Sequence, residues 1–169
     1  NYQEALNLIE SFSYDSFYDP KFIYQKDLAL AAVYRAMEDW SLMKAHAESA
    51  LIILEKLVND NPNDPRFHDS LGSVYAYLDR KEEAIREGER AVSLSPISKD
   101  AIRGHGFVYN LALIYTLVGQ YEDAISKLEY LFSIPAGDII SVSTLRLDPD
   151  WDPLRENPRF KRLVEENTE

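Results

Sequence analysis

Three aspartates near the end of the sequence alternate as the first ligands of a calcium-binding loop do. Asp148, Asp150 and Asp152 would hold the first, third and fifth loop positions. Such a loop then needs a glycine for its sharp turn and a bidentate glutamate as its last ligand. Pro153 and Arg159 stand at those places. We therefore predict no metal site in this segment.

A structural cap is the simpler interpretation of the same segment. Asp-Pro pairs favour turns, and each proline presets the backbone of its turn. We expect Trp151, Leu154 and Phe160 to pack onto the last pair of helices. A hydrolase that depends on Asp150 in this acidic loop is the remaining catalytic alternative.

The histidines and glycines offer little further chemistry. His46, His68 and His105 lack a second ligand at helical spacing, so no metal centre is predicted. Gly104 and Gly106 flank His105, but the pair follows no expected strand and lacks the third glycine or the lysine of a phosphate-binding loop. Loop flexibility or a tight start to a helix is the expected role of this pair, and we predict no cofactor.

Catalysis by acidic or nucleophilic side chains is also not indicated. The glutamates at 82, 83, 87 and 89 are interpreted as the solvated face of a helix, with arginines nearby. The chain has no cysteine, and no serine or threonine lies in a nucleophile-elbow pattern. We predict that the protein is not an enzyme.

Charge and hydropathy exclude two classes of partner. The net charge of −11 repels phosphate backbones and anionic lipid surfaces, so nucleic acid is not an expected partner. The longest nearly apolar run, 107–118, is shorter than the roughly 20 residues needed to span a bilayer. We expect no membrane insertion by this segment and a cytoplasmic location, or a periplasmic one if an upstream transmembrane helix exists.

A repeat organises the elements that would position any binding residues. Leu71-Gly72, Tyr75, Ala84 and Pro96 form one copy, and Tyr34 and Tyr115 mark the copies before and after it at spacings of 41 and 40 residues. Small residues let two helices approach closely, and the tyrosines fill the space between pairs.

These residues resemble the tetratricopeptide repeat family. The resemblance implies an all-α fold, a right-handed superhelix of antiparallel helical hairpins. We expect helices at 1–12, 21–38, 40–60, 65–79, 81–94, 101–118, 120–133, 138–146 and 157–166. One domain, 1–169, is expected. Its parts are the second helix of a truncated repeat at 1–20, repeats at 21–64, 65–98 and 99–136, and a capping segment at 137–169.

The end of the chain resembles a more specific module. The runs 130–135, 145–155 and 158–160 look like the end of a recurring bacterial tetratricopeptide module. In proteins with this ending the repeats commonly follow a Ser/Thr kinase, an adenylate cyclase or a TolB-like or winged-helix region. The resemblance implies a regulatory or signalling protein.

The family binds extended or helical peptides on the concave face, which the first helix of each hairpin lines. Mapped by the repeat register, that face is expected to carry Gln25, Arg35, Arg66, Asp69, Ser73, Tyr77, Tyr109, Asn110 and Thr116, with Leu28 and Leu113 among them. The residues that clamp a chaperone's C-terminal carboxylate are largely missing at the corresponding positions, so that mode is disfavoured.

The expected function is a non-enzymatic scaffold that binds a protein or peptide in this groove. The alternative is a self-association module. In that case the truncated first repeat and the long helix beginning at Trp40 would pair with another copy to give a homo-oligomer.

Overall fold

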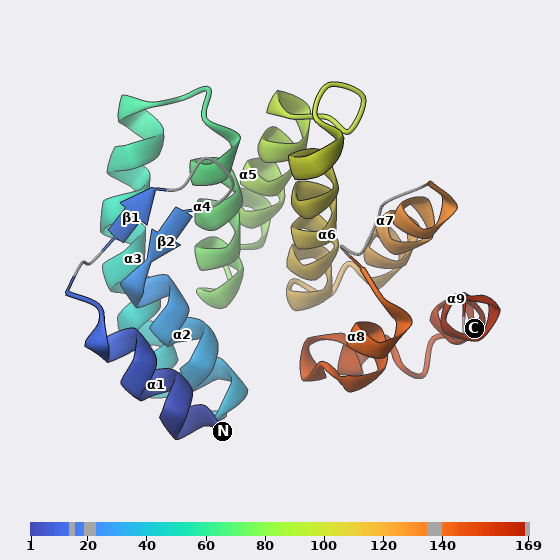
Figure 1. Cartoon of the computed structure of the whole chain (residues 1–169), viewed down its shortest axis with the longest axis horizontal. Coiled ribbons are helices and arrows are strands. Elements are labelled where there is room, and N and C mark those ends of the chain that lie inside the picture. Colours follow the sequence, from blue (N-terminus) through green and yellow to red (C-terminus); the bar gives the residue numbers. More distant parts are fainter. Residues whose placement is uncertain (14–15, 19–22, 135–139, 168–169) are drawn as a thin grey trace.

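The computed structural model describes residues 1–13, 16–18, 23–134 and 140–167 (Figure 1). The described chain is dominated by helices, which confirms the all-α expectation. Two short strands, β1 (Ser16–Tyr18) and β2 (Ile23–Gln25), add a small antiparallel hairpin in which Ser16 pairs with Gln25.

The helices follow one another with short connections. They are α1 Tyr2–Ser11, α2 Lys26–Ala36, α3 Trp40–Asp60, α4 Pro65–Tyr77, α5 Lys81–Leu94, α6 Ala101–Leu117, α7 Tyr121–Ser133, α8 Val142–Leu147, the 3-10 helix η2 Pro149–Leu154, and α9 Pro158–Glu166. The bounds expected from the sequence hold at α3 and α5. The expected helix at 21–38 begins only at Lys26, because β2 precedes it. Part of the expected helix at 138–146 lies outside the described residues, and η2 was not expected.

Side chains that cap the first turn fix where several helices begin. Asp39, Asp64 and Asp100 accept backbone N–H bonds at 3.0 Å at the starts of α3, α4 and α6. Proline follows the cap of α4 at its first position, Pro65, where no backbone N–H is needed. Local sequence therefore sets these boundaries.

Consecutive helices pack as three pairs, α2 with α3, α4 with α5 and α6 with α7. Each pair turns through a residue in the left-handed region: Glu38 (φ 59°), Asp79 (φ 56°) and Gly119 (φ 83°). In each pair, the residue that follows this turn residue donates its backbone N–H to the carbonyl oxygen of a tyrosine five residues earlier, at 2.8 or 2.9 Å. These tyrosines are Tyr34, Tyr75 and Tyr115. The same turn is therefore built three times, at the spacing of the tyrosines in the sequence.

Small residues and tyrosines pack the pairs together. Gly72 lies where an added Cβ would approach the Gly88 nitrogen at 3.1 Å and the Ala84 carbonyl oxygen at 3.2 Å, so glycine permits close contact of α4 and α5. Tyr75 and Tyr115 donate hydroxyl hydrogen bonds to glutamates of α3 and α5, the second helices of the preceding pairs, at 2.8 and 2.9 Å. The tyrosines thus join one pair to the next.

The C-terminal elements close the far end of the core (Figure 1). Trp151, Leu154 and Phe160 are buried in one cluster with side chains of α6 and α7. Arg159 joins α9 to α7 through Glu122 (2.6 Å) and Glu129 (2.6 Å). At the opposite end α1 packs on α2, and Leu6 is its buried residue.

Candidate partner-binding face

The first helices of the three pairs, α2, α4 and α6, form a common surface, which we call the inner face. Contacts join α2 to α4 and α4 to α6, so side chains far apart in the sequence become neighbours there. The structure brings together six of the nine predicted residues, in a polar group and an aromatic group. They are Arg35, Asp69, Ser73, Tyr77, Tyr109 and Asn110.

The polar group bridges α4 and α6. The Asn110 Nδ2 donates to the Asp69 carboxylate at 2.9 Å and to the Ser73 hydroxyl at 3.0 Å. The Ser73 hydroxyl donates in turn to the Asp69 carbonyl oxygen at 3.2 Å. Asn110 therefore acts as a connector between two hairpins as well as a polar group on the face.

Burial raises the pKa of Asp69 to about 7, although the hydrogen bond from Asn110 opposes the shift. The ionised form is disfavoured because few polar groups replace the water that the carboxylate loses. Among the predicted inner-face residues, Asp69 is thus the one whose charge changes near neutral pH.

Replacing Asp69 with asparagine is expected to stabilise the protein at pH 8 and to leave it unchanged at pH 4. A raised folded pKa means that ionisation penalises the folded state, so this contribution is absent below pH 4 and grows between about pH 4 and 7. Because the side chain is half-buried, we expect about 1–3 kcal/mol, less than the full shift implies. Asparagine keeps the acceptor for Asn110.

Chemical denaturation across that pH range would measure the effect. Asp60→Asn, at an exposed position in α3, is the matched control with the same change of charge. If the two variants have the same dependence of unfolding free energy on pH, the burial argument for Asp69 is wrong.

The aromatic group begins with a stacked arginine. The Arg35 guanidinium carbon lies 5.7 Å from the centre of the Tyr77 ring. The same guanidinium forms an ion pair with Asp150 of η2, and the two side chains are 17% and 23% exposed. Burial raises the pKa of Tyr77, while Arg35 acts in the opposite direction. An arginine of the first hairpin therefore binds the carboxylate of a C-terminal element.

Trp151 adds an aromatic contact between the C-terminal segment and the inner face. Its ring meets Tyr109 edge to face, with centroids 5.5 Å apart, and its side chain is fully buried. Residues 148–154 therefore lie against the inner face, reaching from α6 to α2. Sequence reasoning placed this segment on the last hairpin alone and missed Asp150 and Trp151 as members of the face, because the repeat register carries no information about segments outside the repeats.

The three alternating aspartates have separate structural roles. Asp148 caps η2 by accepting the Asp150 N–H at 3.0 Å, Asp150 pairs with Arg35, and Asp152 accepts from Arg155 Nε at 2.5 Å. Arg155 also donates to the backbone carbonyl groups of Arg146 and Asp148. Within the described parts of the chain, no three acidic, histidine or cysteine side chains converge as metal ligands would.

Two predicted groove residues require correction. Gln25 and Thr116 are each 2% exposed and have no surface to offer a partner. Gln25 caps α2 by accepting the Leu28 N–H at 2.5 Å, and the Thr116 hydroxyl donates to the Ala112 carbonyl oxygen at 2.9 Å. Both side chains therefore form hydrogen bonds to the backbone of the helix that they cap or belong to. Leu28 and Leu113 pack partly buried against the core.

Arg66 lies in a different hollow from the polar and aromatic groups. Its guanidinium forms two hydrogen bonds with the Asp64 carboxylate, at 3.0 and 2.6 Å, and holds the pKa of that carboxyl below its usual value. The hollow, of about 430 Å³, is lined by residues 61–66 and Arg103. Arg66, in the first turn of α4, therefore binds the capping residue at the end of the α3–α4 connection.

Two histidines make hydrogen bonds inside the protein, and one of them binds a glutamate that was expected to face solvent. His68 lies between the Glu87 carboxylate (2.6 Å) and the Pro62 carbonyl oxygen (3.0 Å). Glu87 is 8% exposed, which corrects its assignment to a solvated face. His46 binds Asp27 at 2.7 Å.

The glycine beside His105 permits a close approach of backbones. An added Cβ at Gly104 would lie 2.7 Å from the backbone of Ile97, so the start of α6 can pack there only with glycine. The ring of His105 bonds to the Ala101 carbonyl oxygen. The sequence interpretation of a tight helix start fits this geometry.

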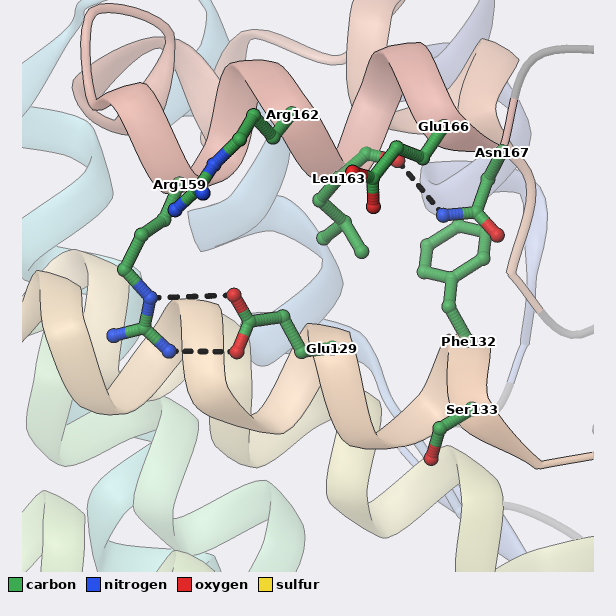
Figure 2. Close-up of a pocket in the computed structure, with 8 residues that line it drawn as sticks. All are labelled: Glu129, Phe132, Ser133, Arg159, Arg162, Leu163, Glu166 and Asn167. Carbon is green, nitrogen blue, oxygen red and sulfur yellow. Dashed lines mark hydrogen bonds and ion pairs between the residues drawn. The ribbon is translucent and has the colours of Figure 1, made fainter.

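Another hollow, of about 410 Å³, lies between α7 and α9 (Figure 2). At one end of the hollow Arg159 of α9 binds Glu129 of α7 through two hydrogen bonds, at 3.2 and 2.6 Å, and it also binds Glu122. At the other end Asn167 donates to the Leu163 carbonyl oxygen at 2.8 Å, which closes the end of α9. The Arg159 bonds hold α9 against α7, and the hollow is a seam between helices.

Comparison with protein-family models, curated proteins and solved structures finds no match to this chain. Within the described residues, no helix is both long and apolar enough to cross a membrane.

Proposed function

We propose that this chain is a stack of tetratricopeptide-type hairpins that binds a peptide segment of another protein on its inner face. Three helix pairs with the same left-handed turn, closed each time on a tyrosine carbonyl, support the repeat interpretation, as do the matching hydroxyl bonds of Tyr75 and Tyr115 to the preceding pairs. The absence of cysteine and of a nucleophile-elbow pattern in the sequence supports a scaffold rather than an enzyme. By resemblance, it would be a regulatory arm of a larger bacterial protein.

One observation carries this proposal. The inner face holds a short segment, residues 148–154, which contains the 3-10 helix η2, through an ion pair to Arg35 and an aromatic contact to Tyr109. Arginine and tyrosine are common anchors at protein interfaces, because a planar side chain loses little entropy and combines apolar area with polar atoms. A surface that binds one segment in this way is suited to bind another.

Panning a random peptide library on the intact protein tests the proposal. Arg35→Ala and Tyr77→Ala are each expected to weaken the selected peptides by about 1–3 kcal/mol, or roughly 5- to 150-fold. Glu82→Ala, at an exposed position on α5, is the matched control and should leave affinity unchanged. Binding that survives both inner-face changes but is lost in the control would place the interface elsewhere. Failure to enrich any peptide would argue against the scaffold.

Self-association is the second candidate, and exposed apolar side chains favour it. Among the large exposed hydrophobic residues, Tyr2, Leu8 and Phe12 lie at α1 and Trp40 and Ile52 lie on α3. These are the two elements that the sequence suggested would pair with another copy. A light-scattering mass that stays dimeric across a dilution series would support this function, and a monomeric mass at every concentration would exclude it.

A further inference from the structure

We propose that the inner face recognises an acidic segment in which an aromatic residue directly follows an aspartate, and that residues 148–154 are the internal competitor for that partner. The inference rests on the proposed function and specifies the chemistry of the partner. The partner is a segment of another protein with the character of Asp150-Trp151, recognised by Arg35, Tyr77 and Tyr109.

The contacts on the face define what it selects. Arg35 lies over the Tyr77 ring and binds a carboxylate with its guanidinium. A guanidinium fork matches a carboxylate in shape and charge, and the ring beneath limits its rotation. Tyr109 presents its ring to an indole at an edge-to-face angle of 65°. Because Asp150 and Trp151 are consecutive, this spacing selects an acid followed at once by an aromatic residue.

The internal segment leaves part of this recognition unused. The Arg35 Nε is buried, and no group among the described residues accepts a hydrogen bond from it. A buried donor without an acceptor weakens a contact. Burial also raises the pKa of Asp148, so the charged form of that carboxyl is disfavoured. A partner that supplied an acceptor to the Arg35 Nε would bind the face more completely than the internal segment does.

Bonds within the segment hold its shape, while Trp151 and Leu154 anchor it in the core. Arg155 bonds to the carbonyl groups of Arg146 and Asp148 and to the Asp152 carboxylate, all within the same stretch of chain. Asp150 binds Arg35 and Trp151 contacts Tyr109, and Leu154 is fully buried in the same cluster as Trp151, so a partner must replace all of these contacts. Since a tethered segment has a high effective concentration, an outside partner must exceed its affinity to displace it.

A change of charge in the segment tests the inference. Asp150→Arg places two arginines together and should release the internal segment, whereas Asp152→Arg makes the same change of charge at a side chain that is 60% exposed and should not. The probe is a labelled peptide with the sequence of residues 146–155, and its binding is followed by fluorescence polarisation. We expect the Asp150→Arg protein to bind the peptide at least tenfold more tightly than the unchanged protein, and the Asp152→Arg protein to bind it as weakly as the unchanged protein does.

Matched peptides and a second variant complete the design. We call a variant whose internal segment is released from the inner face an opened protein. Peptides with alanine for the tryptophan, or asparagine for the central aspartate, should lose at least tenfold in affinity for the opened protein. If Asp150→Arg does not release Trp151, Trp151→Ala in a protein that circular dichroism shows to be folded provides the opening. Failure of both opened proteins to bind the peptide would overturn the inference.

Two further outcomes separate this inference from the proposed function. If the opened proteins ignore the acidic peptide but bind library-selected peptides through Arg35 and Tyr77, the partner chemistry is wrong and the scaffold stands. If neither kind of peptide binds, both proposals fail. If the Asp150→Arg protein dimerises at micromolar concentration and excludes the peptide, a second copy is the occupant and the proposed partner is wrong.

Discussion

Replacing Trp151 with alanine is expected to lower the free energy of unfolding by about 3–5 kcal/mol. Its side chain is fully buried and belongs to the cluster that joins η2, α7 and α9. Its ring also contacts Tyr109 of α6. Removal of the indole loses this contact and leaves a cavity that the surrounding helices can fill only in part, so transfer and cavity terms add. Urea denaturation followed by far-ultraviolet circular dichroism measures the change.

The chain supplies a matched control in its other tryptophan. Trp40 begins α3 and is 58% exposed, so Trp40→Ala should change stability by about 0.5 kcal/mol or less. A loss at Trp151 no greater than the loss at Trp40 would mean that η2 does not pack on α6 and α7 as described.

The repeated part of the fold could be predicted because its causes are local and periodic. Tyrosines recur at matching positions, small residues mark close helix contacts, and aspartates cap helix starts. The bounds of α3 and α5 were predicted correctly for this reason. The small strand hairpin was missed, although aromatic and β-branched residues at 16–18 and 23–25 flank an Asp-Pro pair that signals a turn.

The candidate face was predicted only in part. The repeat register predicts on which side of a helix a residue lies, but it does not predict which residues its side chain contacts. Arg35 was predicted on the inner face, yet its ion pair is with Asp150, a residue outside the repeats. Gln25 and Thr116 share the register but bond to their own helices. Glu87 lies among charged residues in the sequence, and its burial depends on His68 in another helix. Such tertiary partners have no local sequence signal.

Replacing Tyr75 with alanine is expected to cost about 3–5 kcal/mol of stability, the second large effect in this fold. The residue is 5% exposed and lies between the second and first hairpins. Arg80 covers its ring at 4.3 Å, and its hydroxyl donates to Glu55 of α3 at 2.8 Å. Burial raises its pKa to about 12, in agreement with a phenol removed from water. An unchanged thermal midpoint would show that the repeat register for this hairpin is wrong.

The ring and the hydroxyl can be separated. Tyr75→Phe keeps the packing and removes only the hydrogen bond to Glu55, whose side chain is half exposed, so a loss of about 0.5–1.5 kcal/mol is expected. Tyr121→Ala, at a tyrosine that is 42% exposed, is the control for loss of an aromatic ring at the surface. If Tyr75→Phe is as damaging as Tyr75→Ala, the hydrogen bond to α3 rather than the buried ring joins the hairpins. If the phenylalanine variant is nearly as stable as the unchanged protein while alanine is not, packing between hairpins carries the stability, as the contacts of the ring imply.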